Sequence, residues 1–107
     1  MELTEQQIAE LKQKHGGMLM AVEAPDGSTI VIHKPHKADW ADFVDTVNRG
    51  NGSRYTANER LVLKCIAWPS TAEAAAVFNE FPAFAQALSG EVASMAGAQD
   101  ELKTKKL

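Results

Sequence analysis

The feature that most constrains this chain is a short turn sequence between two alternating apolar segments. The turn at 24–28 reads APDGS, in which proline presets one backbone angle and glycine adopts a positive φ at little steric cost. On either side, residues 18–23 and 29–34 place apolar side chains on alternate faces, which is the period of a β-strand. The pattern predicts a two-stranded antiparallel hairpin. Because two strands alone are marginal in water, helices must cover one face of it.

Helical patterns flank the hairpin on both sides. Before it, Thr4 and Gln7 form a capping-box pair at the start of a helix expected over 5–14, which ends at the glycines 16–17. After it, Pro35 ends the second strand. Apolar residues then recur at the spacing i, i+3, i+4 and i+7, which indicates an amphipathic helix with the stripe Trp40, Phe43, Val44 and Val47.

Three more helices are expected in the second half of the chain. Thr56, with Glu three residues later, forms a second capping box for a helix that stops near 68–69. Thr71 is the expected N-cap of a short helix. Pro82 suits the first turn of the last helix, and Gly97 suits its C-terminal cap.

The order of these elements predicts an α+β fold: an N-terminal helix, a two-stranded antiparallel hairpin and then a bundle of about four helices. We expect a single domain over 1–97 and a polar, lysine-rich, flexible tail over 98–107. Gly90 lies inside the last helix and costs about 1 kcal/mol relative to alanine there. A close contact with another helix is the expected reason for it.

Charge and composition argue against several classes of function. The net charge of −3 and the pI of about 5.5 offer no field for a phosphate backbone, so no nucleic-acid partner is expected. No apolar run approaches the roughly 20 residues of a membrane span, and the chain start lacks the pattern of a signal peptide. The single Cys65 fits a reducing compartment. These features predict a cytoplasmic protein.

No residue pattern asks for catalysis or for a cofactor. His33 and His36 lie in the cluster HKPHK, but a metal site needs converging imidazoles and further ligands. Pro35 separates the two histidines and His15 is distant in sequence, so a solvated strand end is preferred. A small metal-dependent or nucleic-acid enzyme centred on these histidines is kept as an alternative. Cys65 has helical core spacing and is interpreted as a buried apolar residue rather than a nucleophile.

Several short motifs occur in a recognisable order. They are LKQKHG at 11–16, IHKP at 32–35, KADWADF at 37–43, CIAWP at 65–69, EFPAF at 80–84 and MAG at 95–97. Each is ordinary for a helix or strand boundary, and only their order and spacing carry weight. Over residues 5–97 the chain resembles the small phage tail assembly chaperones.

The resemblance implies a non-enzymatic protein that binds the tape measure protein and recruits tail tube subunits during tail assembly. It transfers no active-site residues. The six phenylalanines and tryptophans mostly have helical core spacing, and burial in the core is the default expectation for them. An exposed subset would mark a partner-binding surface, for which the candidates are Trp40, Phe43, Phe81 and Phe84. The alternative is a structural tail component, such as a connector or completion protein, that persists in the virion. A homo-oligomer is compatible with either.

Overall fold

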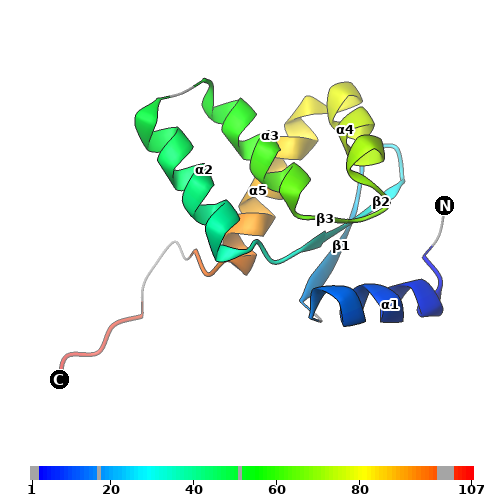
Figure 1. Ribbon diagram of the computed structural model, residues 1–107, viewed down its shortest axis with the longest axis horizontal. Helices are drawn as coiled ribbons and strands as arrows, with labels where there is room; N and C mark the ends of the chain where they lie inside the picture. Colours follow the sequence, from blue (N-terminus) through cyan, green and yellow to red (C-terminus); the bar gives the residue numbers. More distant parts are fainter. Residues whose placement is uncertain (1–2, 17, 51, 99–102) are drawn as a thin grey trace.

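In the part of the chain that the structure describes, the fold consists of five helices and a three-stranded sheet. The computed structural model describes residues 3–16, 18–50, 52–98 and 103–107. Figure 1 shows α2 to α5 on one side of the sheet and α1 on the other. The elements are α1 (Glu5–His15), β1 (Leu19–Glu23), β2 (Thr29–His33), α2 (Lys37–Arg49), α3 (Arg54–Lys64), β3 (Ile66–Trp68), α4 (Thr71–Glu80) and α5 (Pro82–Met95). The predicted α+β class, N-terminal helix and hairpin are confirmed.

The first helix and the hairpin form as their local signals predict. The Thr4 side chain accepts a hydrogen bond from the Gln7 amide at 3.1 Å, and the Gln7 side chain accepts one from the Thr4 amide at 2.9 Å. In the turn, the carboxylate of Asp26 accepts hydrogen bonds from both the amide and the hydroxyl of Ser28, and Gly27 has a φ of 86°. These hydrogen bonds also lower the pKa of Asp26. The hairpin register pairs β1 with β2 in antiparallel fashion along its full length.

The third strand, β3, corrects the prediction that the helix before it continues to residues 68–69. The helix ends at Lys64, and the amide of Cys65 donates to the carbonyl of Val62. The chain then turns to run antiparallel to β2, where the amide of His33 donates to the Cys65 carbonyl at 2.9 Å. Two causes act together. The residue before a proline is disfavoured in the helical region, and the edge of β2 offers unpaired backbone groups.

The starts of α3 and α4 also differ from the prediction. Ser53, and not Thr56, is the N-cap of α3, because its hydroxyl accepts a hydrogen bond from the Thr56 amide at 3.0 Å. The predicted capping box at Thr56 is therefore wrong by one turn. Ser70, and not Thr71, caps α4 by accepting from the Glu73 amide at 3.1 Å. Adjacent serines and threonines offer competing caps, and local pattern alone does not choose between them.

The assignment of Ser53 as the N-cap of α3 can be tested directly by mutation. Replacing Ser53 with alanine is expected to lower the free energy of unfolding by about 1 kcal/mol, because the first turn of α3 loses its side-chain acceptor. Replacing Thr56 with alanine is expected to cost less than half of that, since its amide makes the capping bond and its hydroxyl contacts only the exposed hydroxyl of Ser53, at 2.8 Å. Urea denaturation of both variants measures the difference. An equal or larger cost for Thr56→Ala would contradict the assigned cap.

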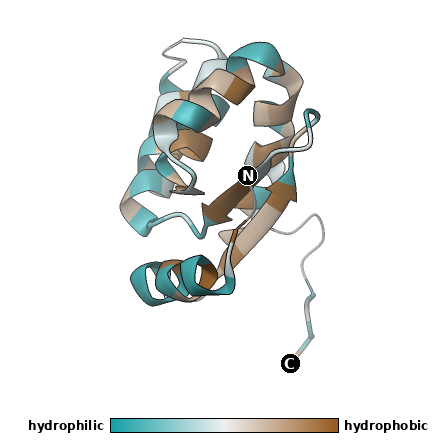
Figure 2. Cartoon of the chain, turned by 90° about the vertical axis from the view of Figure 1, so that its right-hand side faces the viewer, coloured by the Kyte–Doolittle hydropathy of each residue, from teal (hydrophilic) through white to brown (hydrophobic). Residues whose placement is uncertain are grey.

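The core lies between the sheet and the α2–α5 layer. Ile30 and Ile32 point from β2 toward the helices and are almost fully buried. Figure 2 shows the apolar strands enclosed between that layer and α1. The helices and the C-cap of α3, which is Cys65, contribute the other buried members of the cluster: Leu61, Val62, Cys65, Ala74, Phe78, Ala85, Leu88 and Val92. The apolar pattern of this segment predicts burial of Leu61, Val62, Cys65 and Ile66. The first three are buried, and Ile66 is half-buried in β3.

The last helix begins and ends as expected, but its internal glycine behaves differently. Pro82 occupies the first turn, and Gly97 has a φ of 98° just beyond the C-cap. The Ala98 amide donates to the carbonyl of Ala93 at 2.9 Å, which completes a Schellman motif. The predicted helix contact at Gly90 is wrong, because a Cβ added there would meet no atom within 4 Å.

The ends of the chain add little to the fold. Residues 99–102 of the predicted tail over 98–107 lie outside the described residues. The same holds for Gly17, which is part of the predicted helix stop, and for Met1 and Glu2 at the chain start. Residues 103–107 are exposed and have no regular secondary structure. Among the helices that the structure describes, none combines the length and apolarity that crossing a bilayer requires.

Candidate functional site

An open hollow lies between α2, α3 and α5, and we call it the helical hollow. Its volume is about 360 Å³. That is at the small end of ligand sites and leaves room for a few side chains rather than for a large cofactor. Three helices contribute to its lining, which consists of Trp40, Phe43, Arg54, Asn58, Leu61, Ser89, Gly90 and Ala93.

Helix α2 presents its aromatic residues to this hollow. Trp40 and Phe43 are one turn apart, and their ring centroids are 5.3 Å apart with the planes tilted by 44°. An amphipathic helix normally buries its apolar stripe against the core. Here none of the α2 residues, all of which the structure describes, is fully buried, and both aromatics stay half-buried. The apolar stripe of α2 is therefore incompletely covered by the rest of the chain.

Two residues of the hollow were missed as functional candidates from the sequence. Asn58 is only 9% exposed and lines the hollow. Asn58 lies three residues before Leu61 and four before Val62, so it stands at an apolar position of α3. A polar residue at such a position is the sequence signal that could have identified it as a functional candidate. Gly90 leaves open space where a side chain would stand. The loss of helix stability that a glycine causes is therefore not explained by a close packing contact at this position.

An ion-pair cluster holds α2 against α3 beside the hollow. The Nζ atom of Lys64 lies 3.0 Å from a carboxylate oxygen of Asp42 and 4.0 Å from one of Asp39. The hydrogen bond from Lys64, and then its charge, lower the pKa of Asp42. Lys64 therefore pairs with the carboxylates of both Asp39 and Asp42. Arg54 is the one charged residue among those that line the hollow. The lining therefore has a positive formal charge.

The structure separates the four predicted binding residues into two pairs. Trp40 and Phe43 line the helical hollow together. Phe81 lies at the junction of α4 and α5, and Phe84 packs onto the buried Phe78 with ring centroids 6.1 Å apart. All four are half-buried. Only the α2 pair belongs to the hollow.

The histidines and the cysteine have different environments. His15, His33 and His36 gather at one end of the sheet, although His15 is distant from the other two in sequence. Among the described residues, no group of three or more His, Cys, Asp or Glu side chains is placed to hold a metal ion. Cys65 is buried, as expected. Burial, followed by the charge of Asp39, raises the pKa of its thiol to about 11, so the thiol stays neutral near pH 7.

The fold and the hollow define a small α+β protein with helices on both sides of a three-stranded sheet. A family model described as a domain of unknown function, DUF6848, matches residues 11–105, and the chain belongs to this family. Among solved structures, the chain is similar to the uncharacterised protein RBSTP2171 from Bacillus stearothermophilus. The two share 21% identity with a TM-score of 0.73, covering 91% of this chain and 98% of that one. This likeness shows the fold alone. No curated protein matches the chain.

Proposed function

We propose that the chain is a non-enzymatic binding protein that receives an apolar helix of a partner in the helical hollow. Its specific role in this proposal is that of a phage tail assembly chaperone in the host cytoplasm, which binds the tape measure protein and helps to recruit tail tube subunits. The ordered motifs from residue 11 to residue 97 support the specific role.

The observation that carries the proposal is the incompletely covered apolar stripe of α2. Trp40 and Phe43 are only half-buried and stand beside a hollow of about 360 Å³, although helix packing normally buries such residues. Binding a helix by its apolar side chains in a groove is a common mode of protein recognition. Tryptophan is also among the residues that most often dominate binding energy. The pair is therefore the expected centre of the contact.

The lining also suggests the chemistry of the partner helix. Apolar side chains of that helix would cover Trp40 and Phe43, while a polar group would pair with the amide of Asn58. Arg54 favours an acidic residue at its end of the contact. The net charge of −3 on the whole chain would help to keep the complex in solution.

Co-expression tests the proposal. The partner is the longest helical protein encoded near this gene in the same genome, which is the presumed tape measure protein. We expect this chain to increase the soluble fraction of the partner and to co-purify with it, because the hollow covers an apolar stripe that otherwise drives aggregation. The measurement compares soluble partner with and without this chain, and size-exclusion chromatography reports the complex.

An insoluble partner with this chain alone in the supernatant would contradict the chaperone role. Mass spectrometry of purified particles addresses the remaining alternative. A chaperone is absent from finished virions, whereas a connector or completion protein is present in a fixed copy number. Detection of the chain in virions would therefore favour the structural role.

A further inference from the structure

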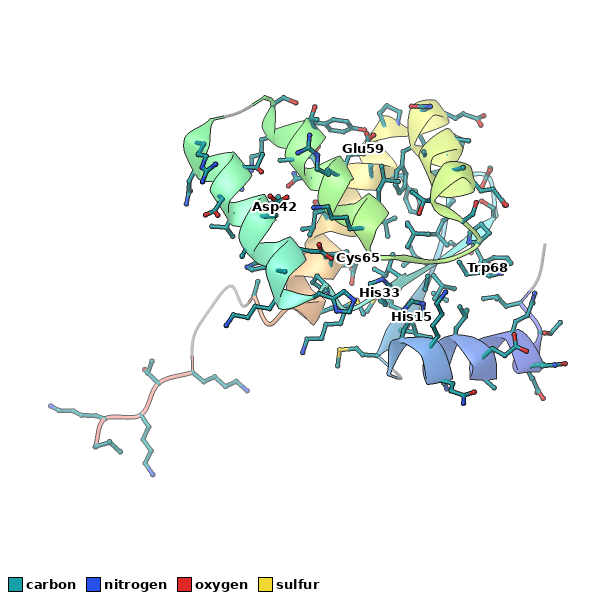
Figure 3. The ribbon with its side chains drawn as sticks, viewed as in Figure 1. His15, His33, Asp42, Glu59, Cys65 and Trp68 are labelled. Carbon is teal, nitrogen blue, oxygen red and sulfur yellow. The ribbon has the colours of Figure 1, made fainter. Side chains whose placement is uncertain are left out.

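Three histidines from three different elements meet where α1 contacts the sheet. His15 is the last residue of α1, His33 is the last residue of β2, and His36 precedes α2. The rings of His15 and His33 are stacked, with centroids 4.6 Å apart and planes 10° apart. The ring of His36 lies 5.6 Å from that of His33. Figure 3 shows His15 and His33 between α1 and the remainder of the fold.

The contact of α1 with the sheet is otherwise slight. No residue of α1, all of which the structure describes, is fully buried, and Ile8 is 37% exposed. A hollow of about 150 Å³ remains between the helix and the sheet. Its lining comes from residues of both and from the chain start, namely Leu3, Ile8, Leu11, Lys12, Leu19, Ala21 and Val31. The stack of His15 on the buried His33 adds a specific contact at the C-terminal end of this helix.

The stacked arrangement suits neutral imidazoles. The Nδ1 atom of His33 lies 2.8 Å from the carbonyl oxygen of Lys34. A carbonyl only accepts, so Nδ1 of His33 carries a hydrogen and donates it. Protonation of both rings of the pair would place two positive charges at stacking distance.

The charges around the cluster disfavour such protonation. The described groups that act on His15 are His33 of β2, His36 before α2 and Lys14 of α1 itself, and none of these is a carboxylate. The α1 macrodipole favours a cation at the helix C-terminus and opposes this effect. Burial, followed by the charges of His33, Lys14 and His36, nevertheless lowers the pKa of His15.

We propose that the histidine cluster is a pH-sensitive latch, in which protonation releases α1 from the sheet while the α2–α5 core stays folded. The two parts differ because α1 has no fully buried residue and meets the sheet through the histidine stack and a partly covered apolar contact, whereas the core is held by a continuous cluster of buried apolar residues. This latch is independent of whatever occupies the helical hollow.

The direction of the pH effect follows from linkage. In the docked state the pKa of His15 is lowered, whereas a released α1 exposes the ring to water with its ordinary pKa of about 6.5. The released state therefore binds more protons as pH falls through about 6.5. Docking of α1 is at full strength above that pH and weakens below it.

Hydrogen exchange of the full chain tests the latch. Backbone amide protection is measured at pH 7.5 and pH 5.0, with a chelator present and with correction for the intrinsic exchange rate. We expect protection in α1 to fall by more than about threefold at pH 5.0, because the released state takes up a proton that docked His15 resists. Protection in α3 is expected to change by less than about threefold. Constant protection of α1 across this range, or an equal loss in α3, would overturn the proposal.

Variants at His15 separate titration from packing. His15→Phe keeps an aromatic ring on His33 but does not titrate, so protection of α1 should vary less than about threefold between the two pH values. His15→Gln loses the stack, so protection of α1 should already be low at pH 7.5. Circular dichroism checks that each variant keeps its fold. A wild-type pH response in His15→Phe, or wild-type protection in His15→Gln, would refute the latch.

Discussion

Replacing Phe78 with alanine is expected to lower the free energy of unfolding by about 3–5 kcal/mol, the range found for removing a buried aromatic side chain. Phe78 is 1% exposed and is the largest fully buried side chain of the core. It lies on α4, contacts the ring of Phe84 from α5 and belongs to the cluster that includes Ile30 and Ile32 of β2. A cavity at this point therefore weakens the contact between both helices and the sheet.

The expected loss is a large part of the total stability, which for a domain of this kind is about 5–15 kcal/mol. Urea denaturation measures it, provided that the slope of the transition is unchanged. Phe81→Ala is the matched control. It removes the same atoms from a half-buried residue outside the core cluster and should cost less than half as much. Equal costs for the two variants would contradict the central position assigned to Phe78.

Replacing Gly90 with leucine is expected to weaken partner binding by at least about 30-fold, which corresponds to about 2 kcal/mol and to the loss of a hot-spot contact. The new side chain would occupy the helical hollow, where a Cβ at this position meets no atom within 4 Å. The fold should tolerate the change. Removing a glycine from a helix interior gains up to about 1 kcal/mol of stability, so lost binding would not reflect unfolding. Titration calorimetry or co-purification with the partner helix measures the effect.

Two further variants make this test specific to the hollow. Ala87→Leu adds a leucine to an exposed position of the same helix that does not line the hollow, and its binding should stay within about threefold of wild type. Trp40→Ala removes an aromatic from the opposite wall and should weaken binding by a similar factor to Gly90→Leu. Wild-type affinity in Gly90→Leu would place the partner elsewhere. An equal loss in Ala87→Leu would show that the effect is not specific to the hollow.

The candidate site could be predicted only in part. Trp40 and Phe43 were chosen from their spacing on one helix, and the structure places them on one wall of a hollow. Phe81 and Phe84 were grouped with them, but they lie near α4 instead. A helical pattern says which residues share a face of one helix, but it does not say which other helix that face meets. For the same reason, Asn58 and Gly90 had no assigned role until three helices were placed around them.

Local interactions determined the parts of this protein that the sequence alone predicts. The capping box at Thr4, the turn at 24–28 and the proline at the start of α5 act over a few residues, so their chemistry sets the structure wherever they occur. The segregation of helices from a hairpin follows from the change of apolar period along the chain.

Tertiary structure decided what depends on distant partners. Residues 66–68 form β3 because the edge of β2 offers backbone hydrogen bonds, although the same apolar run also fits a helix. Cooperative packing likewise brings His15 onto His33 and leaves the apolar stripe of α2 partly uncovered. Such contacts join residues that are far apart in the chain. Their energies depend on the whole fold, so no local pattern contains them.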